Sequence, residues 1–165
     1  MKNFFSEDVS DFLLVLAKHD VRYMIVGGEA VIYYGHARLT GDVDIFYENS
    51  KENVGGLYAA LNDFWAGDIP GIADQKELMQ NGMIFQFGVP PNRIDLINEI
   101  ESVGFLEAWL NKVEEHFISH AAKVPIYYIG LDELIRNKKA VGRHKDMEDL
   151  EFLEKARAKS RKKRS

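Results

Sequence analysis

The sequence predicts an α+β fold in which helices flank a small mixed β-sheet and a helical pair closes the C-terminal end. Three observations support this class. Short runs rich in Val, Ile, Tyr and Phe alternate with segments whose apolar residues recur at helical spacing. Glycines and prolines punctuate the boundaries between these segments. Two helical segments follow one another near the end of the chain, and mixed elements of this kind build helices onto a sheet.

The N-terminal half should begin with a helix at 7–19. Ser6 is a typical N-cap, acidic residues follow it in the first turn, and the apolar residues after them lie at helical spacing. The next expected elements are strands at 22–26 and 42–47, helices at 28–36 and 51–65, and a loop at 66–72.

The C-terminal half should hold two strands joined by the Pro90-Pro91-Asn92 connection, and then mostly helices. Residues 113–129 contain pieces rich in Val, Ile and Tyr, of which the last reads as a strand. The expected elements are a brief helix at 73–79, strands at 83–89, 93–97 and 124–129, and helices at 105–112, 131–140 and 144–158.

Charge is distributed unevenly along the 165 residues. Residues 155–165 carry seven Lys or Arg and no acid, whereas residues 1–154 carry 14 basic and 26 acidic side chains. We expect one domain over 1–154 and a flexible basic tail over 155–165. An acidic body is a poor general surface for nucleic acid. The tail either attracts an anionic partner or is a solvated chain end.

Composition excludes several classes of protein. The chain has no cysteine, so it has no disulfide scaffold, thiolate nucleophile or Cys-based zinc site. Acidic residues at positions 7 and 8 come too early for a signal peptide, and no apolar run approaches the ~20 residues that cross a bilayer. A cytoplasmic protein without a membrane partner is therefore expected.

Three aspartates form the first candidate site. Asp42 and Asp44 alternate in a predicted strand, so their side chains should project from the same face. Asp95 lies in a second apolar strand segment. Strand positions disfavour Asp, and carboxylates held close together repel one another unless a cation lies between them. The pattern favours a site for divalent metals over a solvated strand face.

Gly27 and Gly28 follow the first predicted strand directly. Glycine permits a tight turn and a close approach of the backbone to a ligand. A glycine pair between a strand and a helix can present backbone amides to a phosphate, although such a pair is also a common turn.

Together these residues resemble the nucleotidyltransferase superfamily related to DNA polymerase beta. The family signature is matched by Val26-Gly27-Gly28, thirteen intervening residues, and Asp42-Val43-Asp44-Ile45. Asp95 matches the third acid, which lies on a later strand in the family. The segments 38–41 and 134–149 resemble small bacterial members: minimal nucleotidyltransferases, antibiotic-modifying enzymes and toxins of abortive-infection systems. The resemblance covers residues 22 to about 155.

The resemblance implies a nucleotidyltransferase-like fold and a metal-dependent reaction. Asp42, Asp44 and Asp95 would be the catalytic and metal-binding residues, holding two Mg²⁺ ions, with Mn²⁺ as an alternative. Asp95 would also help to take the proton from the acceptor. A nucleoside triphosphate would be the donor, and the acceptor hydroxyl would belong to a small molecule, an RNA or a protein.

Further residues are candidates for nucleotide binding. Gly27 and Gly28 would support the triphosphate and Thr40 would offer a hydroxyl. Basic side chains could meet phosphate oxygens. Arg38 either binds phosphate or pairs with Asp44, and the remaining basic candidates either bind phosphate or form surface salt bridges with Asp146, Glu148 or Asp149. These remaining candidates are Lys138, Arg143 and Lys145.

Two functions remain open from the sequence. The first is transfer of a nucleoside monophosphate from an NTP to a hydroxyl, with release of pyrophosphate. The second is a non-catalytic module of the same fold that binds a nucleotide or a partner, such as a toxin–antitoxin component. The sequence indicates neither the base preference nor the oligomeric state.

Overall fold

The structure is a computed structural model that describes residues 5–164. The predicted domain and tail extend beyond this range, at residues 1–4 and 165. Seven helical elements are present in the described part of the chain: α1 (Glu7–Lys18), α2 (Gly27–Tyr33), α3 (Lys51–Phe64), the 3-10 helix η1 (Gln75–Met79), α4 (Phe105–Leu110), α5 (Leu131–Val141) and α6 (His144–Arg164). The strands are β1 (Tyr23–Val26), β2 (Asp42–Tyr47), β3 (Ile84–Phe87), β4 (Arg93–Ile97), β5 (Val113–Ser119) and β6 (Ala122–Tyr128).

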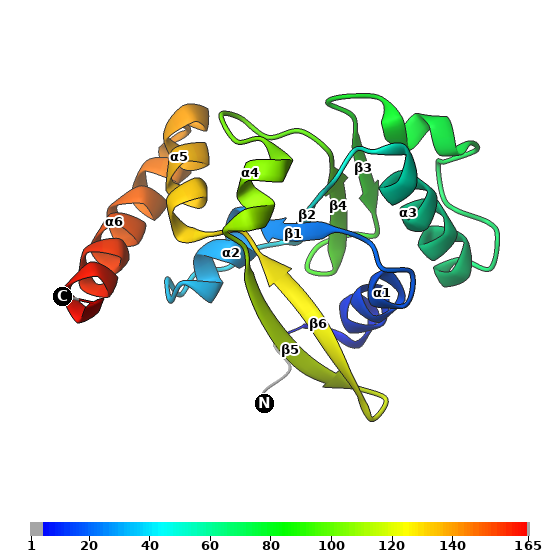
Figure 1. Ribbon diagram of the computed structural model, residues 1–165, viewed down its shortest axis with the longest axis horizontal. Coiled ribbons are helices and arrows are strands. Elements are labelled where there is room, and N and C mark those ends of the chain that lie inside the picture. Colours follow the sequence, from blue (N-terminus) through cyan, green and yellow to red (C-terminus); the bar gives the residue numbers. More distant parts are fainter. Residues whose placement is uncertain (1–4, 165) are drawn as a thin grey trace.

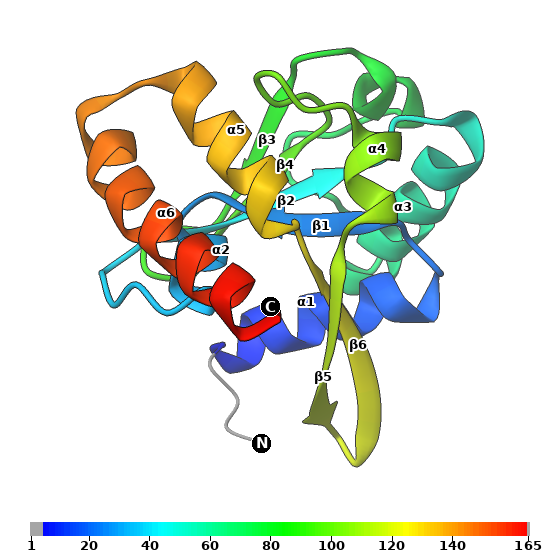
Figure 2. The ribbon, with the colours of Figure 1, turned by 60° about the vertical axis from the view of Figure 1, so that its left-hand side comes forward.

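Within residues 5–164 the strands form one mixed sheet in the order β3-β4-β2-β1-β6-β5. The pairs β2–β4 and β1–β6 are parallel, and the other neighbouring pairs are antiparallel. Helices flank this sheet, and α5 and α6 pack side by side after the last strand (Figures 1 and 2). The α+β class with a mixed sheet is therefore confirmed.

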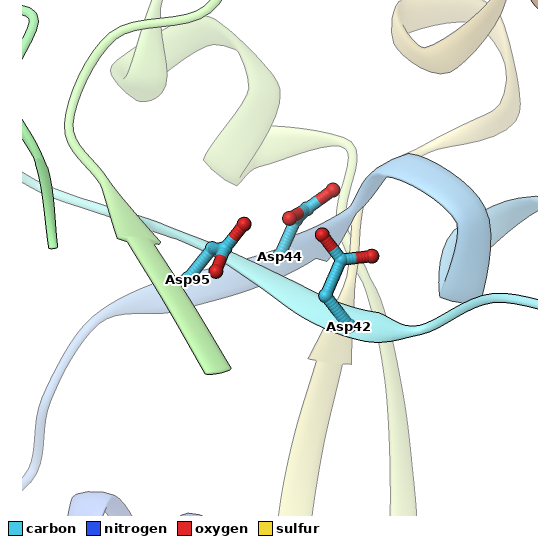
Figure 3. A group of neighbouring side chains, drawn as sticks. All are labelled: Asp42, Asp44 and Asp95. Carbon is cyan, nitrogen blue, oxygen red and sulfur yellow. The ribbon is translucent and has the colours of Figure 1, made fainter. Parts of the chain in front are cut away.

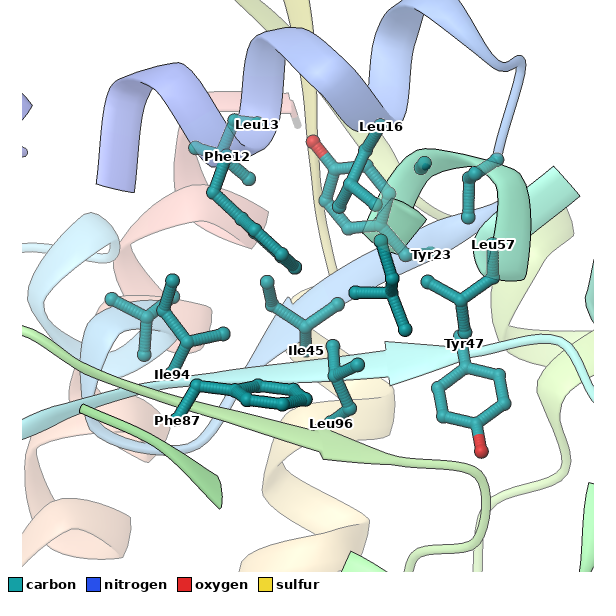
Figure 4. Close-up of a cluster of buried hydrophobic side chains, with 14 of the residues drawn as sticks. Phe12, Leu13, Leu16, Tyr23, Ile45, Tyr47, Leu57, Phe87, Ile94 and Leu96 are labelled. Atoms are coloured by element: carbon teal, nitrogen blue, oxygen red, sulfur yellow. The ribbon is translucent and has the colours of Figure 1, made fainter. Parts of the chain in front are cut away.

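Alternation along the strands divides the core into two clusters. In β2, Val43, Ile45 and Tyr47 face the cluster that α1 and α3 cover (Figure 4). Phe46 faces the opposite side, where α2, α4, α5 and α6 bury their apolar residues. Asp42 and Asp44 share this second face, because strand side chains alternate. The sheet therefore presents its acids on the side of the C-terminal helical pair.

Local signals explain several element boundaries. The Ser6 hydroxyl accepts a hydrogen bond from the Val9 amide, and the Ser50 hydroxyl accepts one from the Asn53 amide, so both act as N-caps. Gly142 ends α5 in the left-handed region at φ 66°, where glycine has no steric penalty.

The main differences from the sequence prediction lie in three elements, and other boundaries differ by a few residues. The brief helix at 73–79 is a 3-10 helix over Gln75–Met79. A full strand, β5, occupies Val113–Ser119 and forms a hairpin with β6 that extends from the body (Figure 1). Helix α6 continues to Arg164 instead of ending near 158, because Ala, Lys and Arg are good helix formers.

The extension of α6 runs through most of the basic tail. Arg157 and Arg161 there approach Asp132 of α5, at 3.5 and 3.9 Å between guanidinium nitrogen and carboxylate oxygen. Flexibility of this segment in solution stays a prediction. Each helix within residues 5–164 is too short or too polar to cross a bilayer.

Candidate active site

Strand register brings the three acids together. In the parallel pair β2–β4, Asp44 lies opposite Asp95, and Asp42 lies opposite Arg93. Side chains on directly opposed residues share one face of a sheet. A single parallel pairing thus brings together Asp44 and Asp95, which are 51 positions apart in the sequence.

The carboxylates of Asp42, Asp44 and Asp95 point toward one another (Figure 3). One oxygen from each lies within 4.8 Å of the other two. Asp95 is buried, with 8% of its side chain exposed, and Asp42 is partly exposed. Three acids this close need cationic neutralisation.

Arg93 provides part of that neutralisation. Its Nη2 donates to Asp42 Oδ2 at 2.8 Å, and its Nε donates to Asp95 Oδ1 at 3.0 Å. A second bond joins Nη2 to Asp95 Oδ2 at 3.3 Å. Sequence reasoning assigned no role to Arg93. Its position two residues before Asp95, on the same strand face, was the available signal.

The surroundings of the three acids shift their pKa values in different directions. Burial and repulsion from Asp42 and Asp95 raise the pKa of Asp44 to about 7. Burial, together with the hydrogen bond to Asp42, also raises the pKa of Asp95. Burial acts the same way on Asp42, but hydrogen bonds from Arg93 and Thr40 outweigh it and lower the pKa of Asp42. Asp44 and Asp95 therefore hold a proton more tightly than an isolated carboxyl group, and Asp42 holds one less tightly.

The glycine turn lies directly against the acids. Gly27 has φ 64°, and a Cβ placed there would lie 2.1 Å from Asp44 Oδ2. A Cβ on Gly28 would lie 2.9 Å from the Thr40 hydroxyl and 2.9 Å from an Arg38 nitrogen. Thr40 in turn donates to Asp42 Oδ1 at 3.2 Å. Only glycine at position 27 leaves space for Asp44 in its observed place.

A hollow of about 380 Å³ opens in front of the acids. All ten residues that the sequence identified as candidates line this hollow. The lining residues are Gly27, Gly28, Arg38, Leu39, Thr40, Gly41, Asp42, Asp44, Arg93, Asp95, Lys138, Arg143 and Lys145. Three carboxylates and five basic side chains therefore face one space, which suits an anion accompanied by cations.

A buried ionic cluster of Lys138, Asp146 and Asp149 supports the basic side of the hollow. The Lys138 ammonium lies 3.0 Å from Asp146 and 3.1 Å from Asp149, and at most 3% of each side chain is exposed. Asp149 also holds Arg38, at 3.1 Å between Nε and Oδ1, and Asp146 holds Arg143 at 2.8 Å. The cluster joins α5 and α6 to the loop before β2.

Two expectations about the basic residues change. Arg38 pairs with Asp149, so the alternative in which it pairs with Asp44 is wrong. The ion pairs of Lys138 with Asp146 and Asp149 are buried in the interior instead of lying on the surface. Lys138 follows Leu134 by one helical turn, on the stripe that packs against the core, and this spacing was the available signal.

The donor set fits a hard divalent cation. Carboxylate oxygens are ligands that Mg²⁺ and Mn²⁺ prefer. The Arg93 guanidinium already stands as a cation between two of the three acids. Asp42, Asp44 and Asp95 are therefore the residues that would hold such ions.

Comparison with known proteins adds no assignment: no protein-family model matches the chain, and no curated protein matches it significantly.

Proposed function

We propose that this protein is a metal-dependent nucleotidyltransferase that moves a nucleoside monophosphate from an NTP to a hydroxyl acceptor. One observation carries the proposal. Three carboxylates within 4.8 Å of one another form the wall of a hollow that five basic side chains also line. A nucleoside triphosphate with divalent cations would suit this lining, because the carboxylates can bind the cations and the basic side chains can bind the phosphates. The likeness of the residue pattern to DNA polymerase beta-related enzymes points to the same reaction.

The proposed reaction breaks a phosphoanhydride bond of the NTP and forms a phosphoester bond to the acceptor. The acceptor oxygen attacks the α-phosphorus, the bond from that phosphorus to the bridging oxygen breaks, and pyrophosphate leaves with the electron pair. The hydroxyl proton passes to the carboxylate of Asp95, which is buried beside the hollow. Mg²⁺ or Mn²⁺ held by Asp42, Asp44 and Asp95 would stabilise charge on the attacking and leaving oxygens.

The basic residues divide into two roles in this proposal. Arg38, Arg143 and Lys145 line the hollow and bind phosphate oxygens, as guanidinium and ammonium groups commonly do. Lys138 is 3% exposed and committed to two carboxylates, so it holds the wall in place. Gly27 and Gly28 allow the triphosphate to approach the backbone.

Transfer of label from NTPs tests the proposal. Each α-labelled NTP is incubated with the protein, Mg²⁺ or Mn²⁺, and cell extract as a source of acceptors. We expect labelled product with at least one NTP, and loss of at least about 100-fold in rate for Asp95→Asn, which keeps the side-chain shape and removes the charge. Asp63→Asn is the matched control, because Asp63 is 49% exposed and pairs with His19 away from the triad.

The outcome also separates the two candidate functions. Nucleotide binding by calorimetry without metal-dependent label in any NTP would contradict the enzyme and support a non-catalytic binding module. A partner that binds equally well after Asp42→Ala and Asp44→Ala would support that module further, including a role as one component of a toxin–antitoxin pair.

A further inference from the structure

The Arg93 guanidinium bridges the carboxylates of Asp42 and Asp95, two of the three acids of the triad. Arg93 lies opposite Asp42 in the register of β2 and β4 and two residues before Asp95 on the same strand face. Its guanidinium uses the edge that carries Nε and Nη2, with Nη2 on Asp42 at 2.8 Å and Nε on Asp95 at 3.0 Å. A bridging guanidinium of this kind is a fixed positive charge, because arginine stays protonated in proteins.

The bonds of Arg93 compete with metal coordination. Both oxygens of Asp95 accept from Arg93, at 3.0 and 3.3 Å, and the Gln86 amide adds a contact to Oδ2 at 3.4 Å. Asp42 uses Oδ2 for Arg93 and Oδ1 for Thr40. A cation that binds these oxygens must therefore share acceptor atoms with the arginine, and it must approach against a positive charge.

Arg93 has room to leave. Its side chain is 31% exposed and lines the same hollow as the acids. A displaced guanidinium would stay in a space that, under the proposed function, also receives phosphate groups. All three bonds of Arg93 to the acids come from the end of its side chain, so a change of side-chain rotamer is enough to break them.

We infer that Arg93 is an internal counter-ion of the metal-free triad. A divalent cation must displace Arg93 from the triad in order to bind, and this competition sets the affinity of the site for metal. The inference rests on the proposed function, because it takes the triad to be a metal site. It assigns Arg93 a regulatory role in the loading of that site. In the absence of metal, the ion pairs of Arg93 with Asp42 and Asp95 lower the repulsion among the acids. They also raise the concentration of metal that is needed to fill the site.

Titration of the purified protein with Mn²⁺ alone, by calorimetry and without nucleotide, tests this inference. We expect Arg93→Gln to bind Mn²⁺ about tenfold more tightly than the wild type, because one directly bonded competing charge is removed. Arg38→Gln is the matched control: it removes the same charge from the same hollow, but Arg38 bonds to Asp149 and not to the triad. Its affinity should change by less than about threefold, as for a charge that acts only at a distance.

A second readout guards against misfolding. In EDTA, Arg93→Gln should melt at a lower temperature than the wild type, and saturating Mn²⁺ should remove the difference, because the metal replaces the lost counter-ion. If Arg93→Gln does not fold without metal, Arg93→Lys carries the comparison. A lysine keeps the charge but not the planar pair of N–H donors, so the Mn²⁺ affinity of Arg93→Lys should fall between those of the wild type and of Arg93→Gln.

The possible failures are distinguishable. If the wild type binds Mn²⁺ and Arg93→Gln binds it no more tightly than Arg38→Gln, the counter-ion inference is overturned and the proposed function is unaffected. If neither the wild type nor Arg93→Gln binds Mn²⁺, the triad is not a metal site, and the proposed function fails together with the inference.

Discussion

Replacement of Lys138 by Met should destabilise the fold more than any change at an exposed lysine. Lys138 is 3% exposed and bonds to Asp146 at 3.0 Å and to Asp149 at 3.1 Å, which are themselves 0% and 2% exposed. Methionine fills a similar volume but leaves two buried carboxylates short of one cation. An uncompensated buried charge is costly because the interior cannot solvate it.

The structure limits the size of this effect. Removal of one partner from a buried ion pair costs about 3–5 kcal/mol. Asp146 keeps Arg143 and Asp149 keeps Arg38, so we expect about 3 kcal/mol, the lower end of that range. For a chain of this length each kcal/mol lowers the melting temperature by roughly 2–4 °C, so the expected fall is roughly 6–12 °C.

Urea unfolding followed by circular dichroism measures the difference. The matched control is Lys139→Met, the adjacent lysine, which pairs with Glu154 at 3.1 Å while 55% of its side chain is exposed. An exposed pair of this kind should contribute less than about 1 kcal/mol. A loss for Lys138→Met that is no larger than the loss for Lys139→Met would refute the view that the cluster is a buried stabilising centre.

The buried cluster of Lys138, Asp146 and Asp149 should also make the stability of the fold depend on pH in the acidic range. Burial opposes ionisation of Asp146, but bonds from Arg143 and Lys138 outweigh it and lower its pKa to about 2 from an ordinary 3.8. A lowered pKa stabilises the folded state above the ordinary value, and this stabilisation is lost as pH falls from 3.8 toward 2. The wild type should therefore lose more stability across this window than Asp146→Asn, as measured by urea midpoints at each pH.

Two further predictions concern the acids directly. Because burial and neighbouring carboxylates raise the pKa of Asp44 from 3.8 to about 7, the metal-free protein should lose stability as pH rises from 3.8 to about 7, and Asp44→Asn should flatten that slope in melting curves recorded in EDTA. Gly27→Ala should weaken Mn²⁺ binding in calorimetry, because its Cβ would lie 2.1 Å from Asp44 Oδ2. The control is Gly67→Ala, where φ is also positive, at 86°, but no atom lies within 4 Å of the added Cβ. This control should cost about 1 kcal/mol of stability and leave the Mn²⁺ affinity unchanged. Equal Mn²⁺ affinities in Gly27→Ala and Gly67→Ala would contradict the argument from the close approach of Gly27 to Asp44. An unchanged dependence of stability on pH in Asp44→Asn would contradict the argument from the raised pKa.

Strand periodicity explains why the triad was predictable in outline. The side-chain period of two places Asp42 and Asp44 on one face whatever the strand pairs with. The proximity of Asp95 depends on the parallel pairing of β2 with β4, which is a long-range contact that no local pattern specifies. The apolar strand segment around Asp95 made it a candidate and the resemblance gave it the place of the third acid, but neither specified this pairing.

The β5–β6 hairpin shows where local signals fail. Its turn residues His120 and Ala121 both have positive φ, at 47° and 65°. Such turns normally contain Asn, Asp or Gly, which tolerate this backbone region. Without them the sequence offered no turn between 119 and 122, and β5 could be foreseen only as an apolar piece.

The buried cluster connects the fold to the candidate chemistry. The acids belong to the central sheet, whereas Arg143 and Lys145 come from the end of the chain, near the start of α6. Lys138 holds Asp146 and Asp149 in the interior, and these two hold Arg143 and Arg38 at the hollow. The C-terminal helical pair therefore contributes to the hollow: Lys138, Arg143 and Lys145 are three of the five basic residues that line it.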